Sequence, residues 1–272
     1  MDRITKKFKE LECQKKKALI GFVSAFDPNY KISKKIINKM PTCGVDIIEI
    51  GLPFSDPMAD GPIIQRSSLR GIKAGFNLNK TFDLVIDFRK INSHTPIILM
   101  GYFNTLFQYG IKKFFSRAKK SGVDGVILVD LPPEEDGIIL SYLKKEKINI
   151  IRLLSPTTDK KRFKTVINSA SGFLYYVSIM GITGTKKPSI EHLKKKVTDI
   201  KKKTILPLVV GFGINERKQV EEICKFADGI VVGSSIVKII EGFTKKKYNE
   251  SAMIEKINKF VKSLSEGCYL KH

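Results

Sequence analysis

The sequence predicts an α/β protein with the fold of a (β/α)8 TIM barrel and an extra N-terminal helix. Three observations predict it. Eight short runs rich in β-branched and aromatic residues recur about every 25–30 residues. Most of them, such as IIEIG, PIILMG and LVVGFG, are apolar throughout, which is typical of parallel strands buried on both faces. Lys-rich segments of helical period separate the runs, so strand and helix alternate along the whole chain.

The elements follow in order from the N-terminus. Ile4, Phe8 and Leu11 recur at helical spacing, so the first dozen residues are expected to form an amphipathic helix packed on the barrel. The expected strands cover residues 18–24, 45–51, 96–101, 124–130, 148–154, 173–178, 206–211 and 229–233. The expected helices cover residues 33–40, 63–74, 78–91, 111–120, 134–145, 160–168, 190–201, 216–225 and 254–264. Because no linker or change of composition divides the chain, residues 1–272 are expected to form a single (β/α)8 barrel domain.

A large open doubly wound sheet is the alternative with the same order of elements. A dinucleotide-binding sheet of that kind would carry a G-x-G-x-x-G turn after its first strand, whereas this strand leads into SAFDPNYK. In a barrel, the loops after the strands hold the chemistry, and phosphate is often bound after strands seven and eight. The sequence has GFG at 211–213 and GSS at 233–235, which favours the barrel.

The chain is strongly basic, with 49 Lys and Arg against 27 Asp and Glu, a net charge of +22. Such a charge brings nucleic acid or an anionic membrane to mind. The excess is nearly all Lys, is spread along the chain, and has few aromatic neighbours of the kind that stack on bases. We interpret it as solvated helix faces in a composition rich in Lys, Ile and Asn, and expect no nucleic acid and no membrane as partners. A polyanion-binding module is the non-enzymatic alternative.

The four cysteines form no C-x-x-C motif and no cluster with histidine. This pattern predicts neither a metal site nor a disulfide framework, and fits a reduced, cytoplasmic setting. No apolar run approaches the roughly 18 residues that a membrane-spanning helix needs.

The segment IEIGLPFSDPMADG, residues 48–61, is the most unusual one. Glu49 stands among isoleucines inside an expected strand, where loss of hydration would raise its pKa and suit it to acid–base catalysis. Pairing with a cation across the barrel is the structural alternative. Asp56 and Asp60 follow in a stiff loop, and either join this chemistry or cap the helix that begins near Pro62.

Two carboxylates in one pocket suit proton transfer on a neutral substrate, and glycoside hydrolysis is one such reaction. The glycines argue against it, because they suit a phosphate group instead. Ser234 and Ser235 open an expected helix whose N–H groups would point at an anion. The glycines that would accompany them are Gly184, Gly211, Gly213 and Gly233. Each alone is explained by ordinary turns, and the loop 179–188 is either a lid or a plain connection.

The segments IEIGLPFSDPMADG, GYFN, YYVSIMGITG and GFGI together resemble the tryptophan synthase alpha chain family over the whole length. The resemblance implies a (β/α)8 barrel lyase that cleaves indole-3-glycerol phosphate into indole and glyceraldehyde 3-phosphate, without a cofactor of its own. It also implies that the indole passes to a beta chain, which carries pyridoxal phosphate, for synthesis of tryptophan in a complex of two alpha and two beta chains.

The resemblance also implies roles for particular residues. Glu49 and Asp60 match the catalytic carboxylates. Positions that match the phosphate site are Gly184, Gly213, Gly233 and Ser234. Positions that match the indole pocket and the lid side of the site are Phe22, Met100, Phe212, Tyr175 and Thr183, although on sequence alone the apolar ones fit a barrel core equally well. Positions that match the face toward the beta chain are Asp56, Asn104, Phe107 and Pro132.

Other phosphate-binding barrels, such as a sugar-phosphate isomerase, epimerase or aldolase, are the rival enzymes. A metal-dependent epimerase would show His and Asp at strand ends, and an aldolase a Lys there. The histidines, His94, His192 and His272, lie in expected helical or terminal segments. Neither these enzymes nor a polyanion-binding module explains the segment 49–61.

Overall fold

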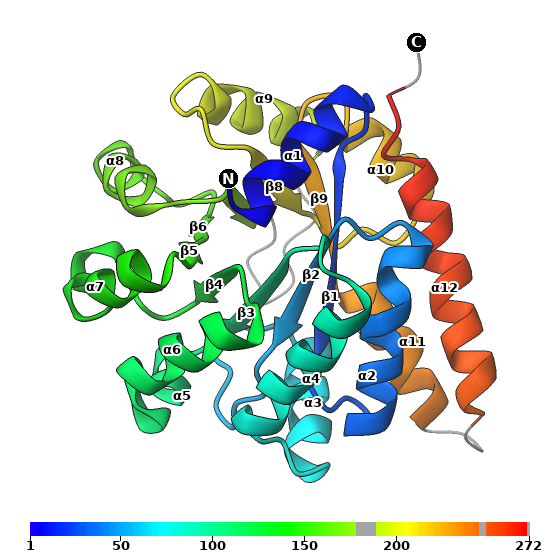
Figure 1. Ribbon diagram of the computed structural model, residues 1–272. Helices are drawn as coiled ribbons and strands as arrows, with labels where there is room; N and C mark the ends of the chain where they lie inside the picture. Colours follow the sequence, from blue (N-terminus) through cyan, green and yellow to red (C-terminus); the bar gives the residue numbers. More distant parts are fainter. Residues whose placement is uncertain (178–188, 245–248, 271–272) are drawn as a thin grey trace.

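The computed structural model describes residues 1–177, 189–244 and 249–270, and within them nine parallel strands form one sheet (Figure 1). The strands are β1 (Ala18–Ser24), β2 (Ile47–Gly51), β3 (Ile97–Gly101), β4 (Gly125–Leu128), β5 (Asn149–Ile150), β6 (Arg152–Leu154), β7 (Leu174–Val177), β8 (Leu208–Gly211) and β9 (Gly229–Val232). Their order is β5-β4-β3-β2-β1-β9-β8-β7-β6. This is the order of a sheet that curls round on itself.

The two ends of that order meet in one stretch of chain. β5 pairs with β4 and β6 pairs with β7, and only Ile151 separates β5 from β6. The Ile151 amide donates to the carbonyl of Val126 at 3.0 Å, which continues the ladder across the break. The expected strand 148–154 is therefore one barrel strand interrupted at a single residue, and the predicted (β/α)8 TIM barrel is confirmed.

Helices surround the strands (Figure 1). They are α1 (Arg3–Cys13), α2 (Tyr30–Lys39), α3 (Pro62–Lys73), α4 (Leu78–Ile91), α5 (Phe103–Tyr109), α6 (Ile111–Ser121), α7 (Gly137–Glu146), α8 (Lys160–Ser169), α9 (Ile190–Lys201), α10 (Arg217–Ile223), α11 (Ser234–Thr244) and α12 (Glu250–Glu266), with 3-10 turns at Met40–Cys43 and Pro133–Glu135. α5 has no counterpart among the expected helices; it is seven residues long, and only its Leu106 is buried. His94 lies in a bend between α4 and β3 and not in a helix.

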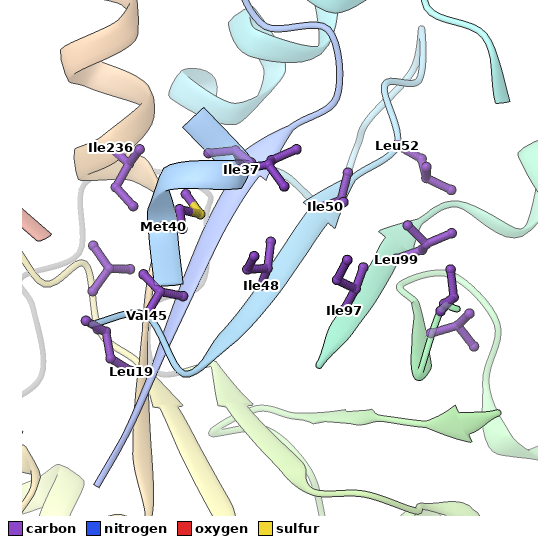
Figure 2. Close-up of a cluster of buried hydrophobic side chains, with 14 of the residues drawn as sticks. Leu19, Ile37, Met40, Val45, Ile48, Ile50, Leu52, Ile97, Leu99 and Ile236 are labelled. Atoms are coloured by element: carbon purple, nitrogen blue, oxygen red, sulfur yellow. The ribbon is translucent and has the colours of Figure 1, made fainter. Parts of the chain in front are cut away.

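The strands are buried on both faces, as their continuous apolar runs predict. Side chains alternate along each strand. In β1, Ile20 joins the cluster inside the barrel, whereas Leu19 joins the larger cluster between sheet and helices. Figure 2 shows that outer layer, in which strand residues such as Ile48 pack toward helix residues such as Ile37.

The predicted N-terminal helix is confirmed, and it covers one end of the barrel. The Ile4 side chain of α1 is completely buried in the inner cluster, and Phe8 packs on Phe173 with ring centroids 5.8 Å apart. Arg3 forms an ion pair of 2.9 Å with Asp124, which directly precedes β4. α1 therefore closes the end where the strands begin, and the end where they finish is left for a site.

None of the helices within the described residues combines the length and the apolar character that crossing a membrane requires.

Candidate active site

A cavity of about 730 Å³ opens where the strands end. This is the end of the barrel on which enzymes of this fold place their chemistry. The described residues that line it are Phe22, Glu49, Met58, Ala59, Asp60, Gly61, Pro62, Ile63, Ile64, Met100, Val129, Leu153, Leu154, Ser155, Thr157, Thr158, Arg162, Tyr175, Val177, Gly211, Gly213, Ile214, Val231, Gly233 and Ser234. Both predicted catalytic carboxylates are among them.

Glu49 faces the cavity because of its place in β2. Its neighbours Ile48 and Ile50 point outward into the outer cluster, so alternation turns Glu49 inward. Its side chain is 1% exposed, and its Oε2 atom has no hydrogen-bond partner among the described residues. Burial, with a smaller contribution from the charge of Asp60, raises the pKa of Glu49 to about 8. No Lys or Arg among the described residues pairs with Glu49. Within that part of the chain, Glu49 is therefore not half of an ion pair across the barrel, which was the structural alternative to a catalytic role.

Asp60 is held by a hydrogen bond and does not cap α3. The N-cap residue of α3 is Gly61, which has no side chain to cap with. The Asp60 carboxylate instead accepts a hydrogen bond of 3.2 Å from the Tyr102 hydroxyl, which itself accepts one of 2.9 Å from the amide of Ala59. Burial raises the pKa of Asp60 to about 6, and the Tyr102 hydrogen bond opposes that rise. Near neutral pH, Glu49 therefore holds its proton and Asp60 is mostly ionised.

The loops after β8 and β9 meet at another part of the cavity. Gly213 has φ of 61°, a conformation that favours glycine, and α11 begins at Ser234, directly after Gly233. The Ser235 hydroxyl donates to the Ile214 carbonyl at 2.6 Å and so joins the two loops. The free N–H groups of a helix N-terminus make this corner suitable for an anion such as phosphate.

Two strand-end glycines make room for aromatic rings beside the carboxylates. A Cβ atom on Gly51 would lie 2.6 Å from the Phe22 ring, and one on Gly211 would lie 2.8 Å from the Tyr175 ring. Burial, together with the charges of Glu49 and Asp60, raises the pKa of the Tyr175 hydroxyl, which keeps that hydroxyl protonated and able to donate. The rings form apolar walls next to the acid groups.

The structure brings together most of the predicted site residues. Those that line the cavity are Phe22, Glu49, Asp60, Met100, Tyr175, Gly213, Gly233 and Ser234. Phe212 does not line it. Because Val209 points into the barrel and Val210 points outward, alternation along β8 turns Phe212 outward, where it is 3% exposed in the outer cluster. Thr183, Gly184 and the loop 179–188 lie outside the described residues.

The predicted partner residues lie outside the cavity, after neighbouring strands. Asp56 follows β2, Asn104 and Phe107 stand on α5 after β3, and Pro132 follows β4. Asp56, Asn104 and Phe107 are exposed, and Pro132 is half-buried.

Five residues that line the cavity or contact its carboxylates are not predicted from the sequence: Tyr102, Ser155, Thr157, Thr158 and Arg162. The position of these residues in the sequence, just after expected strands, could have revealed most of them. Tyr102 directly follows β3, next to the strand that carries Glu49, and the segment SPTT directly follows β6. Polar side chains just after a barrel strand are expected to face the site.

These features define a class of protein. A parallel barrel with two carboxylates of separate pKa and an anion-binding corner in one partly apolar cavity is suited to acid–base chemistry on a phosphate-bearing substrate. Among the described residues, no group of three or more His, Cys, Asp or Glu side chains is arranged to hold a metal ion.

The chain belongs to the tryptophan synthase alpha chain family, whose model matches residues 8–267. Tryptophan synthase subunit alpha from Legionella pneumophila str. Paris is 34% identical over 98% of each chain, with a TM-score of 0.90. A structure from Aquifex aeolicus VF5 is 36% identical over 98% of this chain and 99% of that one, with a TM-score of 0.88. The aminoacrylate-bound tryptophan synthase from M. tuberculosis is 25% identical over 98% of this chain and all of that one, with a TM-score of 0.86.

The activity of the chain is accordingly that of its family, the lyase half-reaction that cleaves indole-3-glycerol phosphate to indole and glyceraldehyde 3-phosphate. This finding favours the lyase over the sugar-phosphate isomerases, epimerases and aldolases that share phosphate-binding glycines.

Proposed function

We propose that Glu49 and Asp60 carry out this cleavage, with Glu49 as the acid and base and Asp60 as the acceptor for the indole N–H. The observation that carries the proposal is that the two carboxyl groups face one cavity and titrate about two pH units apart, near 8 and near 6. One carboxylic acid and one carboxylate are therefore available together at neutral pH.

The reaction needs a proton at indole C3, relief of the positive charge that then forms on the ring N–H, and removal of the proton from the adjacent hydroxyl. The protonated Glu49 supplies its proton to C3 and becomes a carboxylate. It then takes the hydroxyl proton while the carbon–carbon bond breaks, so an aldehyde and neutral indole leave and Glu49 is protonated again. The ionised Asp60 stabilises the intermediate through a hydrogen bond from the indole N–H.

The rest of the cavity holds the two ends of the substrate. We assign the phosphate to Gly213, Gly233 and Ser234, with Gly184 of the loop outside the described residues. The apolar walls at Phe22 and Met100 hold the flat indole ring, with Tyr175 beside the carboxylates and Thr183 on the lid side. Holding both ends orients the bond to be broken over Glu49. Phe212 lies in the outer hydrophobic cluster and is left out of the indole pocket.

The same resemblance supports a partner. We propose that the surface at Asp56, Asn104, Phe107 and Pro132 faces a tryptophan synthase beta chain, which carries the pyridoxal phosphate, in a complex of two alpha and two beta chains. Phe107 supports this assignment because its large apolar side chain is 59% exposed. We further propose that residues 1–272 work as one domain in the cytoplasm, with no cofactor bound to this chain.

Release of indole from indole-3-glycerol phosphate tests the proposed roles. The purified chain is assayed alone and with a beta chain and serine, beside Glu49→Gln and Asp60→Asn. Both variants are expected to fold and to lose about 100-fold or more of the turnover, since general acid–base help contributes roughly 10²–10⁴-fold. Near-normal turnover in either variant contradicts the role given to that residue.

A further inference from the structure

One wall of the cavity is polar and comes from the segment between β6 and α8. Ser155, Thr157 and Thr158 line the cavity and bond to one another, with Ser155 Oγ 2.9 Å from Thr157 Oγ1 and 3.2 Å from Thr158 Oγ1. The amide of Ser155 also donates to Thr158 Oγ1 at 3.0 Å. These bonds fix the loop that leads into α8.

Arg162 stands in the first turn of α8, at the end of this wall, and also lines the cavity. The side chain of Asp159 caps the helix by accepting from the Arg162 amide at 2.8 Å. The cap fixes where the Arg162 side chain leaves the helix. The ion pairs formed between described residues do not include the guanidinium of Arg162, which is exposed at the mouth of the cavity.

The charges around the cavity suggest a role for Arg162. Among the described residues that line the cavity, the charged side chains are Glu49, Asp60 and Arg162. The anion corner at Gly213, Gly233 and Ser234 offers backbone N–H groups and a hydroxyl, without a formal positive charge. A phosphate ester that approaches the cavity therefore meets the carboxylate of Asp60, and among the described lining residues Arg162 carries the charge that attracts it.

We propose that Arg162 captures the phosphate end of the substrate at the mouth of the cavity and so speeds its entry, while the bond is broken at Glu49 and Asp60. This inference rests on the proposed function, because it presumes a substrate with a phosphate group. A charge at the rim of a binding site acts mainly on the association rate and on its dependence on salt. It acts little on the chemical step.

Binding of a ligand that cannot react tests the proposal directly. The phosphate ester of 3-(indol-3-yl)propan-1-ol has the two ends of the substrate but lacks the hydroxyl whose proton must leave. The chain contains no Trp, so the ligand carries the only indole fluorophore in the mixture and its fluorescence reports binding. Stopped-flow mixing with the full chain gives the association and dissociation rate constants over a range of salt concentrations.

Arg162→Met is compared with Lys164→Met, which removes the same charge from an exposed position on the same helix that does not line the cavity. At low salt, we expect the association rate constant of Arg162→Met to fall about three- to tenfold, with dissociation changed less than about twofold. The difference in association rate constant between Arg162→Met and the unaltered chain is expected to shrink as salt is added. The screening length is about 10 Å at 0.1 M salt and becomes shorter at higher concentrations. Lys164→Met should behave as the unaltered chain, and Arg162→Lys should regain most of the rate.

Three outcomes overturn the proposal: an unchanged association rate in Arg162→Met, an equal loss in Lys164→Met, or the same loss with the uncharged alcohol as ligand. Turnover separates this failure from failure of the proposed function. Arg162→Met is expected to keep its kcat and lose kcat/KM at low salt, whereas Glu49→Gln loses kcat at every salt concentration. If the chain is active and Arg162→Met leaves kcat/KM unchanged, the capture role of Arg162 is wrong and the proposed function still stands.

Discussion

The two carboxylates at residues 49 and 60 differ because their surroundings differ. Glu49 stands in the wall of the barrel with no hydrogen bond to Oε2 from the described residues, and Asp60 stands on a loop with a hydrogen bond from Tyr102. Loss of hydration raises the pKa of both, and it does so further for Glu49. Burial, the charge of Asp60 on Glu49 and the Tyr102 hydrogen bond to Asp60 together separate the pKa values of the two groups, and this separation suits the roles proposed for them.

The two pKa values predict how kcat/KM depends on pH. Asp60 must be ionised and Glu49 protonated, so activity should rise as pH increases through about 6 and fall as it increases through about 8. These values belong to the pair as a whole. Initial rates of indole release between about pH 5 and pH 9.5 check the bell shape. A flat profile across this range contradicts the assignment of the two groups.

Stability should show the cost of burying Glu49. The carboxyl group titrates near 4.5 when unfolded and near 8 when folded, so between those values the unfolded chain has released a proton that the folded chain keeps. Ionisation of this group therefore does not lower the free energy of unfolding below about pH 4.5. The free energy of unfolding falls as pH rises toward 8, and at pH 7 it is lower by roughly 3 kcal/mol. Glu49→Gln should therefore unfold at a higher denaturant concentration at pH 7.5 than the unaltered chain.

The same comparison at pH 5 is the control, because there the gain from Glu49→Gln should nearly vanish. Glu134→Gln, which alters an exposed carboxylate, should change stability at neither pH. A gain of equal size at both pH values for Glu49→Gln means that the effect is one of packing and not of ionisation.

At the scale of elements, charged side chains join the two helices that carry the ends of the site. Arg70 of α3 forms bonds of 2.7 and 2.8 Å with the buried Asp27, and Arg66 of α3 forms bonds of 2.6 and 3.0 Å with Glu241 of α11. α3 begins just after Asp60, and α11 begins at Ser234. The network therefore ties the helix that follows Asp60 to the helix that begins at the anion corner.

Gly51 at the end of β2 leaves room for the Phe22 ring. In Gly51→Ala the new Cβ would lie 2.6 Å from the Phe22 ring, so the ring must move toward the cavity. We expect a loss of about 1–3 kcal/mol of stability, as for other overpacked sites, and a higher KM with a smaller change in kcat. Urea unfolding and steady-state kinetics measure both.

Gly242→Ala is the matched control, because a Cβ at that position of α11 meets nothing within 4 Å. It should raise stability by about 0.5–1 kcal/mol, since Ala favours a helix interior over Gly. If Gly51→Ala also stabilises the chain and leaves KM unchanged, the Phe22 ring does not shape the pocket.

In the whole molecule, the two ends of the barrel differ: one is closed by a helix and the other holds the cavity. α1 closes the end where the strands begin, and the cavity occupies the end where they finish. The surface assigned to the partner adjoins the cavity end, because its residues follow β2, β3 and β4, which are neighbours in the sheet. A partner bound there lies close to the loop that carries Asp60.

A substitution on the proposed partner surface should weaken binding of the beta chain without unfolding the barrel. Phe107→Asp places a charge on an exposed apolar position of α5, so binding of a beta chain should weaken and the stimulation of indole release by that chain should fall at least about tenfold, as for a central contact of an interface. Activity of the isolated chain should stay the same. Ile205→Asp, a fully exposed site before β8 at the other end of the barrel, is the control and should retain the stimulation.

Much of the fold and of the site follows from local patterns. The strand at residues 18–24 and the helix at residues 78–91 begin and end as predicted, because apolar runs and helical periods are properties of neighbouring residues. Glu49 among isoleucines signals a buried acid before any coordinates are known. The resemblance to the alpha chain family identified Asp60, whose role the residues alone left undecided between catalysis and capping.

Local sequence patterns were enough to predict the barrel, the order of its elements, the buried Glu49 and the family of the chain. The three-dimensional structure was needed to show that one strand breaks at Ile151, that Phe212 points outward, and that Tyr102 donates a hydrogen bond to Asp60. It also placed Arg162 at the mouth of the cavity. The physical reason is that these features depend on which residues become neighbours across the sheet and on how far water is excluded from them, and no stretch of sequence carries that information alone.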